Sequence, residues 1–348
     1  MPGLPTVLSN NTLANGILTT FNDMWMFDSQ PSPHLASCMD LGLPSNARQQ
    51  IYAYYETAPY PRRVNYGDTT PFNSFDSKNF TVINYLFKHA IPWSKYDEKD
   101  DQTHSLLTLA QMGGDHFATI PERAFFEIVN GSASLLPSIP NTPDGAALYS
   151  ATDGAGAARF GVAASGIYGG NIIAGTGVAS GDAIRTDFWA AYSAMLLFQD
   201  KQSQPLFDAG KVNKFTILYH PSREQTFREA FKQGITGLII AGASGGHVGT
   251  GTAVAAAAVE NTLKESGATF DLWPSQRCSD TSDWFIFADV MGVAHKPIFQ
   301  QNRDPLEVHV ATDENSDEVR KTGTKYIQWV NRQGTGVSIP YLTCKVNN

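Results

Sequence analysis

The segment Asn79–Gly131 limits what this chain can fold into more than any other part of the sequence. It opens with a β-rich run, Phe80–Phe87, and then carries two stretches of helical character. The first is expected at about Asp101–Met112 and is expected to end at Gly113-Gly114, because glycine commonly follows the last helical residue. The second has Pro121 at a suitable first position. The segment contains no pattern typical of catalysis, which favours a scaffold element of an assembly protein over an enzyme.

Residues 1–47 show no sustained hydrophobic period and are punctuated by prolines. We interpret them as an N-terminal arm that lies across a neighbouring molecule, with terminal disorder as the alternative. The aromatic residues Trp25 and Phe27 argue against full disorder and are candidates for contacts between subunits.

Residues 48–79 predict a two-stranded extended hairpin with its tip around Pro61–Pro71. Tyrosines alternate there with polar residues, and prolines interrupt the run. A hairpin of this length is marginal alone and needs a surface to lie on. Its candidate inter-subunit contacts are Tyr60, Arg62, Arg63, Tyr66 and Phe72.

The adjacent pair Arg62-Arg63 has two interpretations that the sequence leaves open. It forms either a solvated tip or an ion pair with an acidic patch on a neighbouring subunit.

Residues 132–289 indicate a continuous middle domain of mixed α/β type. Residues 132–181 are rich in Gly, Ala, Ser and Pro and are expected to form surface loops and short strands. Asp182–Gln199 follows the helical spacing, and Ser222-x-x-Gln225 predicts a capping box that opens a helix through Gln233. The expected strands of this domain are Phe215–Tyr219, Thr269–Trp273 and Trp284–Ala288.

The C-terminal residues 290–348 are mostly strand-like. We expect them to pair with the strand that opens Asn79–Gly131 into one sheet beside the long helix, which gives a domain split between 79–131 and 290–348. The expected C-terminal strands are Lys296–Phe299, Glu307–Thr312, Lys325–Asn331 and Ser338–Val346.

The composition indicates a protein whose surface is partly covered by other subunits. Charged residues make up 17% of the chain, below the roughly 25% of typical soluble domains, whereas 42% are hydrophobic. The net charge of −8 argues against a protein that reads nucleic-acid sequence, because such a protein needs a basic footprint. It allows a protein that encloses nucleic acid without gripping it.

The cysteines Cys38, Cys278 and Cys344 have neither the number nor the spacing of a disulfide framework or a zinc site, so folding in a reducing compartment is expected. The first residues lack the charged region and apolar run of a secretory signal. No apolar run approaches the ~18 residues of a membrane helix, so no membrane association is expected.

Three features could carry chemistry, and each has a simpler explanation. Gly242–Thr252 follows an apolar run as a phosphate loop would, but it lacks the Lys-Ser/Thr of a P-loop and is more typical of a surface loop. The acidic residues of 97–101 suit a solvated helix start better than a cation site. The eight histidines show no H-E-x-x-H spacing. We therefore assign no catalytic, cofactor-binding or metal-binding residue.

The order of these elements and several short motifs resemble a known family. The motifs are Asp144-Gly145, His220-Pro221, Asp283–Phe287 followed by Lys296–Phe299, and a run from Asp313 through Gly323 to Gly334-x-Gly336. Over most of residues 48–346 the chain resembles tailed-phage major capsid proteins of the Hong Kong 97 fold, nearest to the Mu-like prophage major head subunit group.

The resemblance implies an α+β fold with four parts. These are an N-terminal arm (1–47), an extended E-loop hairpin (48–79), a peripheral domain with the spine helix (79–131 and 290–348) and an axial domain (132–289). The resemblance also implies a structural protein, not an enzyme, that assembles into pentamers and hexamers of an icosahedral shell.

In the terms of that family, the shell encloses phage double-stranded DNA without sequence-specific binding. The implied partners are further copies of the chain together with portal, scaffolding or decoration proteins, and no cofactor is implied. The implied location is the virion, after assembly in the host cytoplasm.

The chain departs from the family pattern at three points. The expected break at Gly113-Gly114 interrupts a spine helix that is often longer in this family. Some members form a covalent cross-link from a lysine in the hairpin, but here the tip carries Arg62 and Arg63, and Lys78 lies at the base, so no such cross-link is expected. The N-terminus also lacks the long charged helical segment that serves some members as a scaffold.

Two alternatives remain at the level of sequence. One is the shell of a cellular nanocompartment with the same fold, which would enclose an enzyme rather than a genome. The other is a soluble enzyme that binds a ligand through Gly242–Thr252.

Overall fold

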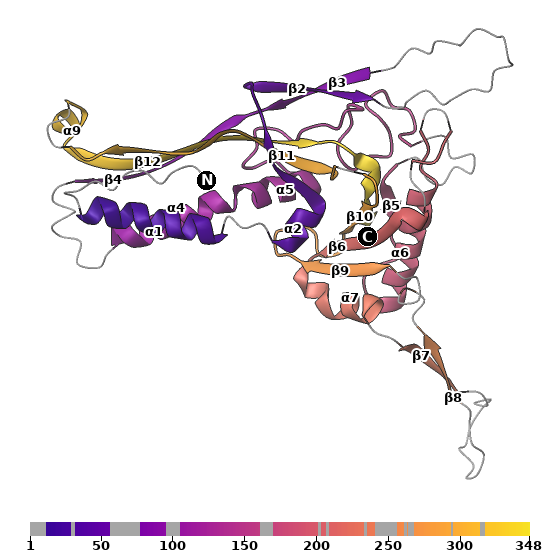
Figure 1. Ribbon diagram of the computed structural model, residues 1–348. Coiled ribbons are helices and arrows are strands. Elements are labelled where there is room, and N and C mark those ends of the chain that lie inside the picture. Colours follow the sequence, from indigo (N-terminus) through magenta and orange to yellow (C-terminus); the bar gives the residue numbers. More distant parts are fainter. Residues whose placement is uncertain are drawn as a thin grey trace, which may run out of the picture. The chain divides into compact units, whose positions relative to one another are not determined.

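Two compact units make up the chain (Figure 1). The computed structural model describes residues 12–28, 32–55, 77–94, 105–160, 170–200, 203–206, 209–232, 235–240, 256–260, 263, 268–293, 295–313 and 317–348. Unit 1 comprises Met1–Tyr54, Ser77–Pro143 and Ile298–Ser338, and unit 2 comprises Tyr55–Asp76, Asp144–Pro297 and Ile339–Asn348.

A four-stranded sheet forms the centre of unit 1 (Figure 1). Its strands lie in the order β1 (Met39–Pro44), β11 (Ile298–Ala311), β12 (Thr324–Val337) and β4 (Tyr85–Ser94). β11, β12 and β4 are antiparallel neighbours, whereas β1 joins β11 in parallel. The short helix α9 (Asp317–Thr322) follows β11 in sequence. The expected pairing between the strand that opens Asn79–Gly131 and the C-terminal strands is confirmed.

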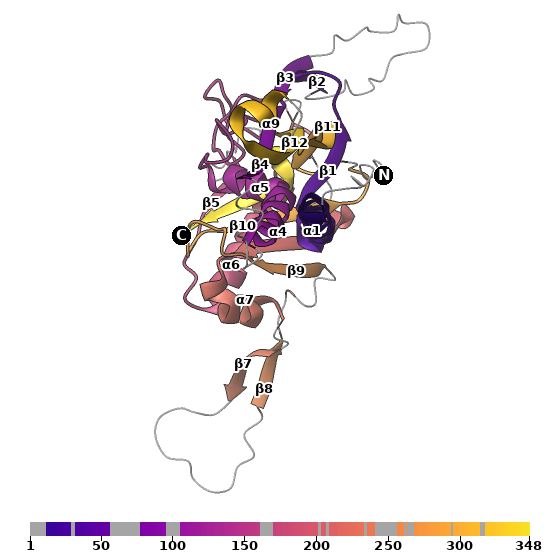
Figure 2. The same ribbon diagram turned by 90° about the vertical axis from the view of Figure 1, so that its left-hand side faces the viewer.

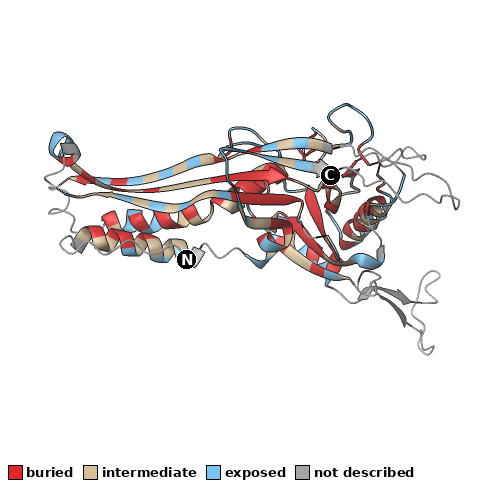
Figure 3. Ribbon diagram, turned by 45° about the horizontal axis from the view of Figure 1, so that its top comes forward, coloured by how far each residue is buried: buried red, intermediate tan, exposed pale blue. Residues whose placement is uncertain are grey.

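The helices α1 (Thr12–Asp28) and α4 (Ser105–Ala118) lie side by side against this sheet (Figure 2). Alternate residues in the first part of β12 are buried, and Ile327 and Trp329 share one hydrophobic cluster with both helices. The ring of Phe21 stacks on Trp329 with 3.9 Å between ring centroids. In Figure 3, the buried residues of α1 and α4 gather on one side of each helix.

α4 runs without interruption through Gly113-Gly114, so the predicted helix end at this pair is wrong. A Cβ atom at Gly114 would lie 2.6 Å from the backbone oxygen of Phe21 in α1. A Cβ atom at Gly113 would lie 2.5 Å from Nε2 of His89 in β4. The two glycines therefore let α4 approach its neighbours closely, which offsets the ~1 kcal/mol that each costs in helix propensity.

The chain leaves α4 at Thr119, and α5 (Ile120–Asn130) follows. Pro121 lies in the first turn of α5, and Gly131 caps its C-terminus in the left-handed conformation with φ of 67°. The predicted start of this helix is confirmed.

The described part of the predicted N-terminal arm is not extended, and that prediction is wrong for residues 12–28. These residues form the 17-residue helix α1, and α2 (Pro33–Cys38) and β1 follow it. The buried residues Ala14, Ile17, Leu18 and Phe21 recur with the helical spacing. The sequence pattern did not predict this helix, because its buried apolar residues cover only two turns and mainly exposed and half-exposed residues follow them.

Two separate two-stranded hairpins complete the set of strands outside the larger sheets. β2 (Gln49–Tyr55) pairs with β3 (Ser77–Ile83), as predicted for residues 48–79. β7 (Ile235–Ile240) pairs antiparallel with β8 (Ala256–Glu260). The predicted hairpin tip around Pro61–Pro71 lies outside the described residues.

A five-stranded sheet forms the centre of unit 2. Its strands lie in the order β5 (Ile172–Ala174), β13 (Thr343–Asn347), β10 (Trp284–Val290), β6 (Val212–Tyr219) and β9 (Thr269–Pro274). Among its described residues, the helices of the unit are α6 (Gly181–Leu196) and α7 (Glu224–Phe231), with short 3-10 turns at Ala209–Lys211, Pro221–Arg223 and Pro340–Leu342. The strands predicted within 215–288 and the helix predicted within 182–199 are confirmed.

Aromatic edge-to-face contacts dominate the core of unit 2. Phe188 of α6 lies 5.2 Å from Phe215, 5.5 Å from Phe231 and 5.3 Å from Phe270, measured between ring centroids. Each such pair contributes about 0.5–1.5 kcal/mol beyond the burial of its area. One phenylalanine therefore joins α6 to α7 and to two strands of the sheet.

The last strand belongs to unit 2, which corrects the predicted membership of residues 339–348 in the domain 290–348. β13 pairs with β10 from Thr343 opposite Phe287 to Val346 opposite Trp284. The buried face of β13, Cys344 and Val346, joins the aromatic core of unit 2, and this burial fixes its place.

The turn between β6 and α7 differs in detail from the predicted capping box. His220 takes the capping role, because its Nδ1 accepts a hydrogen bond from the backbone N–H of Ser222 at 3.2 Å. The 3-10 turn Pro221–Arg223 then leads into α7, which has no side-chain cap at Arg223. His220-Pro221 therefore has a turn role at the end of β6.

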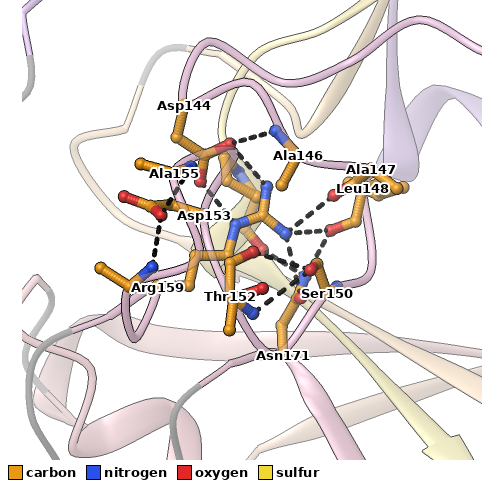
Figure 4. Close-up of polar contacts among 12 residues, drawn as sticks. Asp144, Ala146, Ala147, Leu148, Ser150, Thr152, Asp153, Ala155, Arg159 and Asn171 are labelled. Atoms are coloured by element: carbon orange, nitrogen blue, oxygen red, sulfur yellow. Dashed lines mark hydrogen bonds and ion pairs between the residues drawn. The ribbon is translucent and has the colours of Figure 1, made fainter.

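One buried arginine organises the irregular segment that begins at Asp144 (Figure 4). Nε of Arg159 donates to Asp144 at 2.6 Å, and NH2 donates to the second carboxylate oxygen at 3.1 Å. NH1 donates to the carbonyl oxygens of Ala147 and Leu148 at 2.9 and 2.7 Å. The side chain of Arg159 is 0% exposed, so removing it would leave the carboxylate of Asp144, only 13% exposed, without its counter-charge.

We predict that Arg159→Met lowers the free energy of unfolding by about 3–5 kcal/mol, the usual cost of leaving one partner of a buried ion pair. Arg228→Met is the matched control. Its partner is Glu224, and the arginine side chain is 67% exposed, so the expected change is below ~1 kcal/mol. Urea unfolding measures both, and equal losses in the two variants would refute the assigned role of Arg159.

We predict that Gly114→Ala destabilises unit 1 by about 1–3 kcal/mol, because the new methyl group meets the rigid backbone of α1. Gly16→Ala tests the same helix pair from the other side. Its Cβ would meet only the end of the Leu107 side chain, at 3.2 Å, so gained helix propensity should make this change neutral or stabilising. Urea unfolding of the two variants checks the prediction, which fails if Gly114→Ala is as stable as Gly16→Ala.

Candidate assembly site at the base of the hairpin

Most of the predicted inter-subunit contact residues lie outside the described residues. These are Tyr60, Arg62, Arg63, Tyr66 and Phe72. Trp25 lies in α1, where its half-buried ring packs against the cluster of α1, α4 and the sheet. Phe27 also lies in α1, and its side chain is outside the described part. The proposed contacts of these residues remain predictions.

The base of the predicted hairpin is described, and aromatic rings attach it to the sheet of unit 1. Tyr52 of β2 stacks on Phe80 of β3 at 5.4 Å between centroids. Both rings meet Phe299 of β11 edge to face, at 5.3 and 6.3 Å. The two hairpin strands therefore share one aromatic anchor on the sheet.

A buried amide network reinforces this anchor. The hydroxyl of Tyr52 donates to Oε1 of Gln301 at 2.7 Å, and Nε2 of Gln301 donates to Oδ1 of Asn84 at 2.9 Å. Gln301 is 0% exposed and Asn84 is 4% exposed. Buried amides of this kind are costly unless their donors and acceptors are paired, so the network favours one geometry.

Asn84 is the single residue between β3 and β4, where the chain passes from the hairpin into the sheet. Its Nδ2 donates to Oγ of Ser45 at 2.8 Å and to the carbonyl oxygen of Ala47 at 2.7 Å. Its backbone N–H donates to the carbonyl oxygen of Arg48 at 2.9 Å. One side chain thus ties the segment that enters the hairpin to the point where the hairpin ends.

Two glycines of β12 let the hairpin base approach the sheet. A Cβ atom at Gly334 would lie 2.5 Å from the backbone oxygen of Ile83, and one at Gly336 would lie 2.7 Å from a methyl group of Val82. Larger residues would hold β3 away from β12. This gives a physical reason for the Gly334-x-Gly336 motif.

The site is electrically neutral at its centre. Burial raises the pKa of the Tyr52 phenol above its usual value, so the hydroxyl remains a donor at neutral pH. The amides of Asn84 and Gln301 carry no charge. The arrangement can hold and direct the hairpin, and it offers no nucleophile, acid or base.

Sequence reasoning missed Asn84 and Gln301 because neither belongs to a local motif, and they lie 217 positions apart. A weak signal was present. The polar run Gln300-Gln301-Asn302 directly follows the predicted strand Lys296–Phe299, where polar side chains have to find partners or solvent.

The other candidate sites give little evidence of catalysis or of metal or ligand binding. Gly242–Thr252 and the acidic residues of 97–101 lie outside the described residues. Within the described part no group of three His, Cys, Asp or Glu side chains could hold a metal ion. Cys38, Cys278 and Cys344 are buried and form no disulfide, and burial raises the pKa of the Cys278 thiol to about 12.

A shallow surface groove lies over α7. Its charged lining is already engaged. Glu224 pairs with Arg228, Gln225 donates to Glu229 at 2.9 Å, and Lys232 donates to the Phe270 carbonyl oxygen at 2.6 Å. These contacts account for the groove without a ligand.

A search of the described helices found none with the length and apolar character needed to cross a membrane.

No protein-family model matches the sequence, and no curated protein sequence matches it. Several solved structures resemble it. The capsid of a native GTA particle is 11% identical, with a TM-score of 0.52, and the match covers 91% of this chain and 90% of that one. The mature capsid of bacteriophage PhiM1 is 10% identical, with a TM-score of 0.49 and coverage of 91% and 87%. A virus-like particle from Pyrococcus furiosus is 9% identical, with a TM-score of 0.47 and coverage of 94% and 96%.

The first of these matches establishes the fold. The chain has the α+β fold of Hong Kong 97-type major capsid proteins, as predicted. The closer relationship to the Mu-like group stays a prediction.

We predict that Asn84→Ala lowers the free energy of unfolding by about 2–3 kcal/mol, because it removes the side-chain acceptor of the buried Gln301 amide and the donor to Ser45 and Ala47. Asn79→Ala, on the exposed side of β3, is the matched control, with an expected change within about 0.5 kcal/mol. Chemical unfolding compares the two. An Asn84→Ala protein as stable as the control would contradict the anchoring role.

Proposed function

We propose that this protein is the major capsid protein of a tailed phage, and that its copies assemble into a closed icosahedral shell. The observation that carries the proposal is the fold shared with the capsid subunit of the GTA particle over 91% of this chain. The hairpin base supports it, because a neutral buried anchor suits an element that must project in a fixed direction toward a neighbour.

Assembly buries apolar surface that a single subunit leaves exposed to solvent. Ile51 at the hairpin base is 63% exposed, and Leu86 on β4 is 51% exposed. Single exposed apolar residues are ordinary in monomers. These two matter because of their position, since Ile51 lies on the hairpin strand β2 and Leu86 lies on β4, the strand that follows the hairpin. Closed symmetry repeats each weak contact in every subunit.

In this proposal the subunits form the pentamers and hexamers of the shell, which encloses double-stranded DNA. The net charge of −8 supports a container, because a strongly basic wall would bind DNA non-specifically and oppose its packing and release. Portal, scaffolding or decoration proteins are the further partners. The protein functions in the virion, is assembled in the host cytoplasm and has no enzymatic activity.

The direct test is electron microscopy of the purified protein. We expect uniform particles, and particles isolated from infected or induced cells should contain double-stranded DNA. Particles that instead contain an enzyme would favour the nanocompartment. If the protein sediments as a compact monomer and binds nucleotide through Gly242–Thr252, the proposal of a shell protein is wrong.

We predict that deletion of Tyr60–Asn73 leaves soluble subunits or capsomers but abolishes closed shells, because the hairpin loses its contacts with a neighbour. The conservative variant Thr69→Ser with Thr70→Ser keeps the length of the segment and should still form shells. Negative-stain microscopy and sedimentation distinguish the outcomes. Normal shells from the deletion variant would refute the assembly role of the hairpin.

A further inference from the structure

His89 occupies the point where α1, α4 and the sheet of unit 1 meet. Its ring stacks on Phe21 of α1, with 6.3 Å between centroids and 22° between planes. It also lies 6.1 Å from the ring of Trp329 in β12. One titratable side chain is therefore built into the aromatic cluster that attaches α1.

The Nε2 atom of His89 is buried and has no hydrogen-bond partner among the described residues. It faces Gly113, where an added Cβ atom would lie 2.5 Å away. The close approach of α4 thus leaves no room for a water molecule on that side. A proton bound at Nε2 would bring a charge to a contact that offers it no acceptor.

The surroundings of His89 disfavour its charged form. Burial lowers the pKa of His89, and the positive charge of His116 on α4 lowers it further. The residues that α1 and β12 place against the ring, Phe21 and Trp329, carry no charge. On β4 itself, the nearest charged residue is Lys88, which is exposed on the opposite face of the strand.

We infer that His89 is an acid-sensitive latch, which holds α1 on α4 while it is neutral and releases α1 when it is protonated. The sheet side of the contact is held by the hydrogen-bonded pairing of β4 with β12 from Tyr85 to Ser94. α1 is held by side-chain packing with α4 and the sheet, so the helix is the element that separates.

The pH range follows from linkage. The pKa of His89 is lowered in the packed form, so the released form binds the proton more tightly. The packing is therefore fully present above the ordinary histidine pKa of ~6.5. It weakens as the pH falls through that value toward the pKa of the packed form. One proton changes the equilibrium by at most about tenfold per pH unit.

Hydrogen exchange of the full-length chain tests the latch. Protection factors, corrected for intrinsic exchange, are compared at pH 7.5 and pH 5.5 for α1 and for β10 in unit 2. We expect the protection of α1 to fall severalfold at the lower pH, and that of β10 to change much less. An unchanged α1 would overturn the proposal.

Two variants separate the latch from general acid sensitivity. His89→Phe keeps an aromatic ring and removes the proton site, so α1 should keep its protection at pH 5.5. His116→Gln removes the neighbouring charge, so the pKa of His89 should rise and release should begin at higher pH. Equal pH dependence in wild type and His89→Phe would refute the role of His89.

A further measurement covers the case in which His89→Phe fails to fold. Titration of the His89 ring by NMR in the wild-type chain should give a midpoint below ~6.5. A midpoint at or above that value would overturn the latch without any variant.

Discussion

Strand β12 is the element on which unit 1 depends, because both sides of the unit are built against it. Its first half presents Trp329 to the helices, where Phe21 stacks at 3.9 Å between ring centroids. Its second half presents Gly334 and Gly336, which allow the base of the hairpin to lie close to the sheet. The same strand is hydrogen-bonded to β11 on one side and to β4 on the other. On this one strand, Trp329 therefore makes the contact with the helices, and Gly334 and Gly336 allow the contact with the hairpin base.

The buried polar networks of Arg159 and of the hairpin base differ in chemistry because they stabilise different kinds of structure. In unit 2, Arg159 satisfies carbonyl oxygens of an irregular segment, and a guanidinium has enough donors to hold several at once. At the hairpin base, Tyr52, Asn84 and Gln301 form a neutral chain. Neutral amides avoid the large desolvation cost of a buried charge, and they still impose one geometry through paired donors and acceptors.

The sequence allowed the hairpin and most strands of the sheet in unit 1 to be predicted from local period and turn residues, and the fold class followed from a resemblance in element order and short motifs. The parallel strand β1 of that sheet was not predicted. It did not reveal contacts between distant residues. Gly113-Gly114 looked like a helix end, because the residues whose close approach requires the pair, His89 of β4 and Phe21 of α1, are distant in the sequence. The network of Asn84 and Gln301 escaped notice for the same reason. Local signals do not encode which long-range surface an amide or a glycine will meet.

The latch and the hairpin base contact the same strand, β12, at different points, and this separates their effects. Trp329 and Gly334 are five residues apart on β12, about 17 Å at the rise of an extended strand. The ladder between them pairs β12 with both neighbours through this stretch. Release of α1 would remove packing from one face of the sheet but would break none of these hydrogen bonds. The direction of the hairpin should therefore survive loss of the α1 contact, so acid would change the helical side of the subunit while its assembly element stays in place.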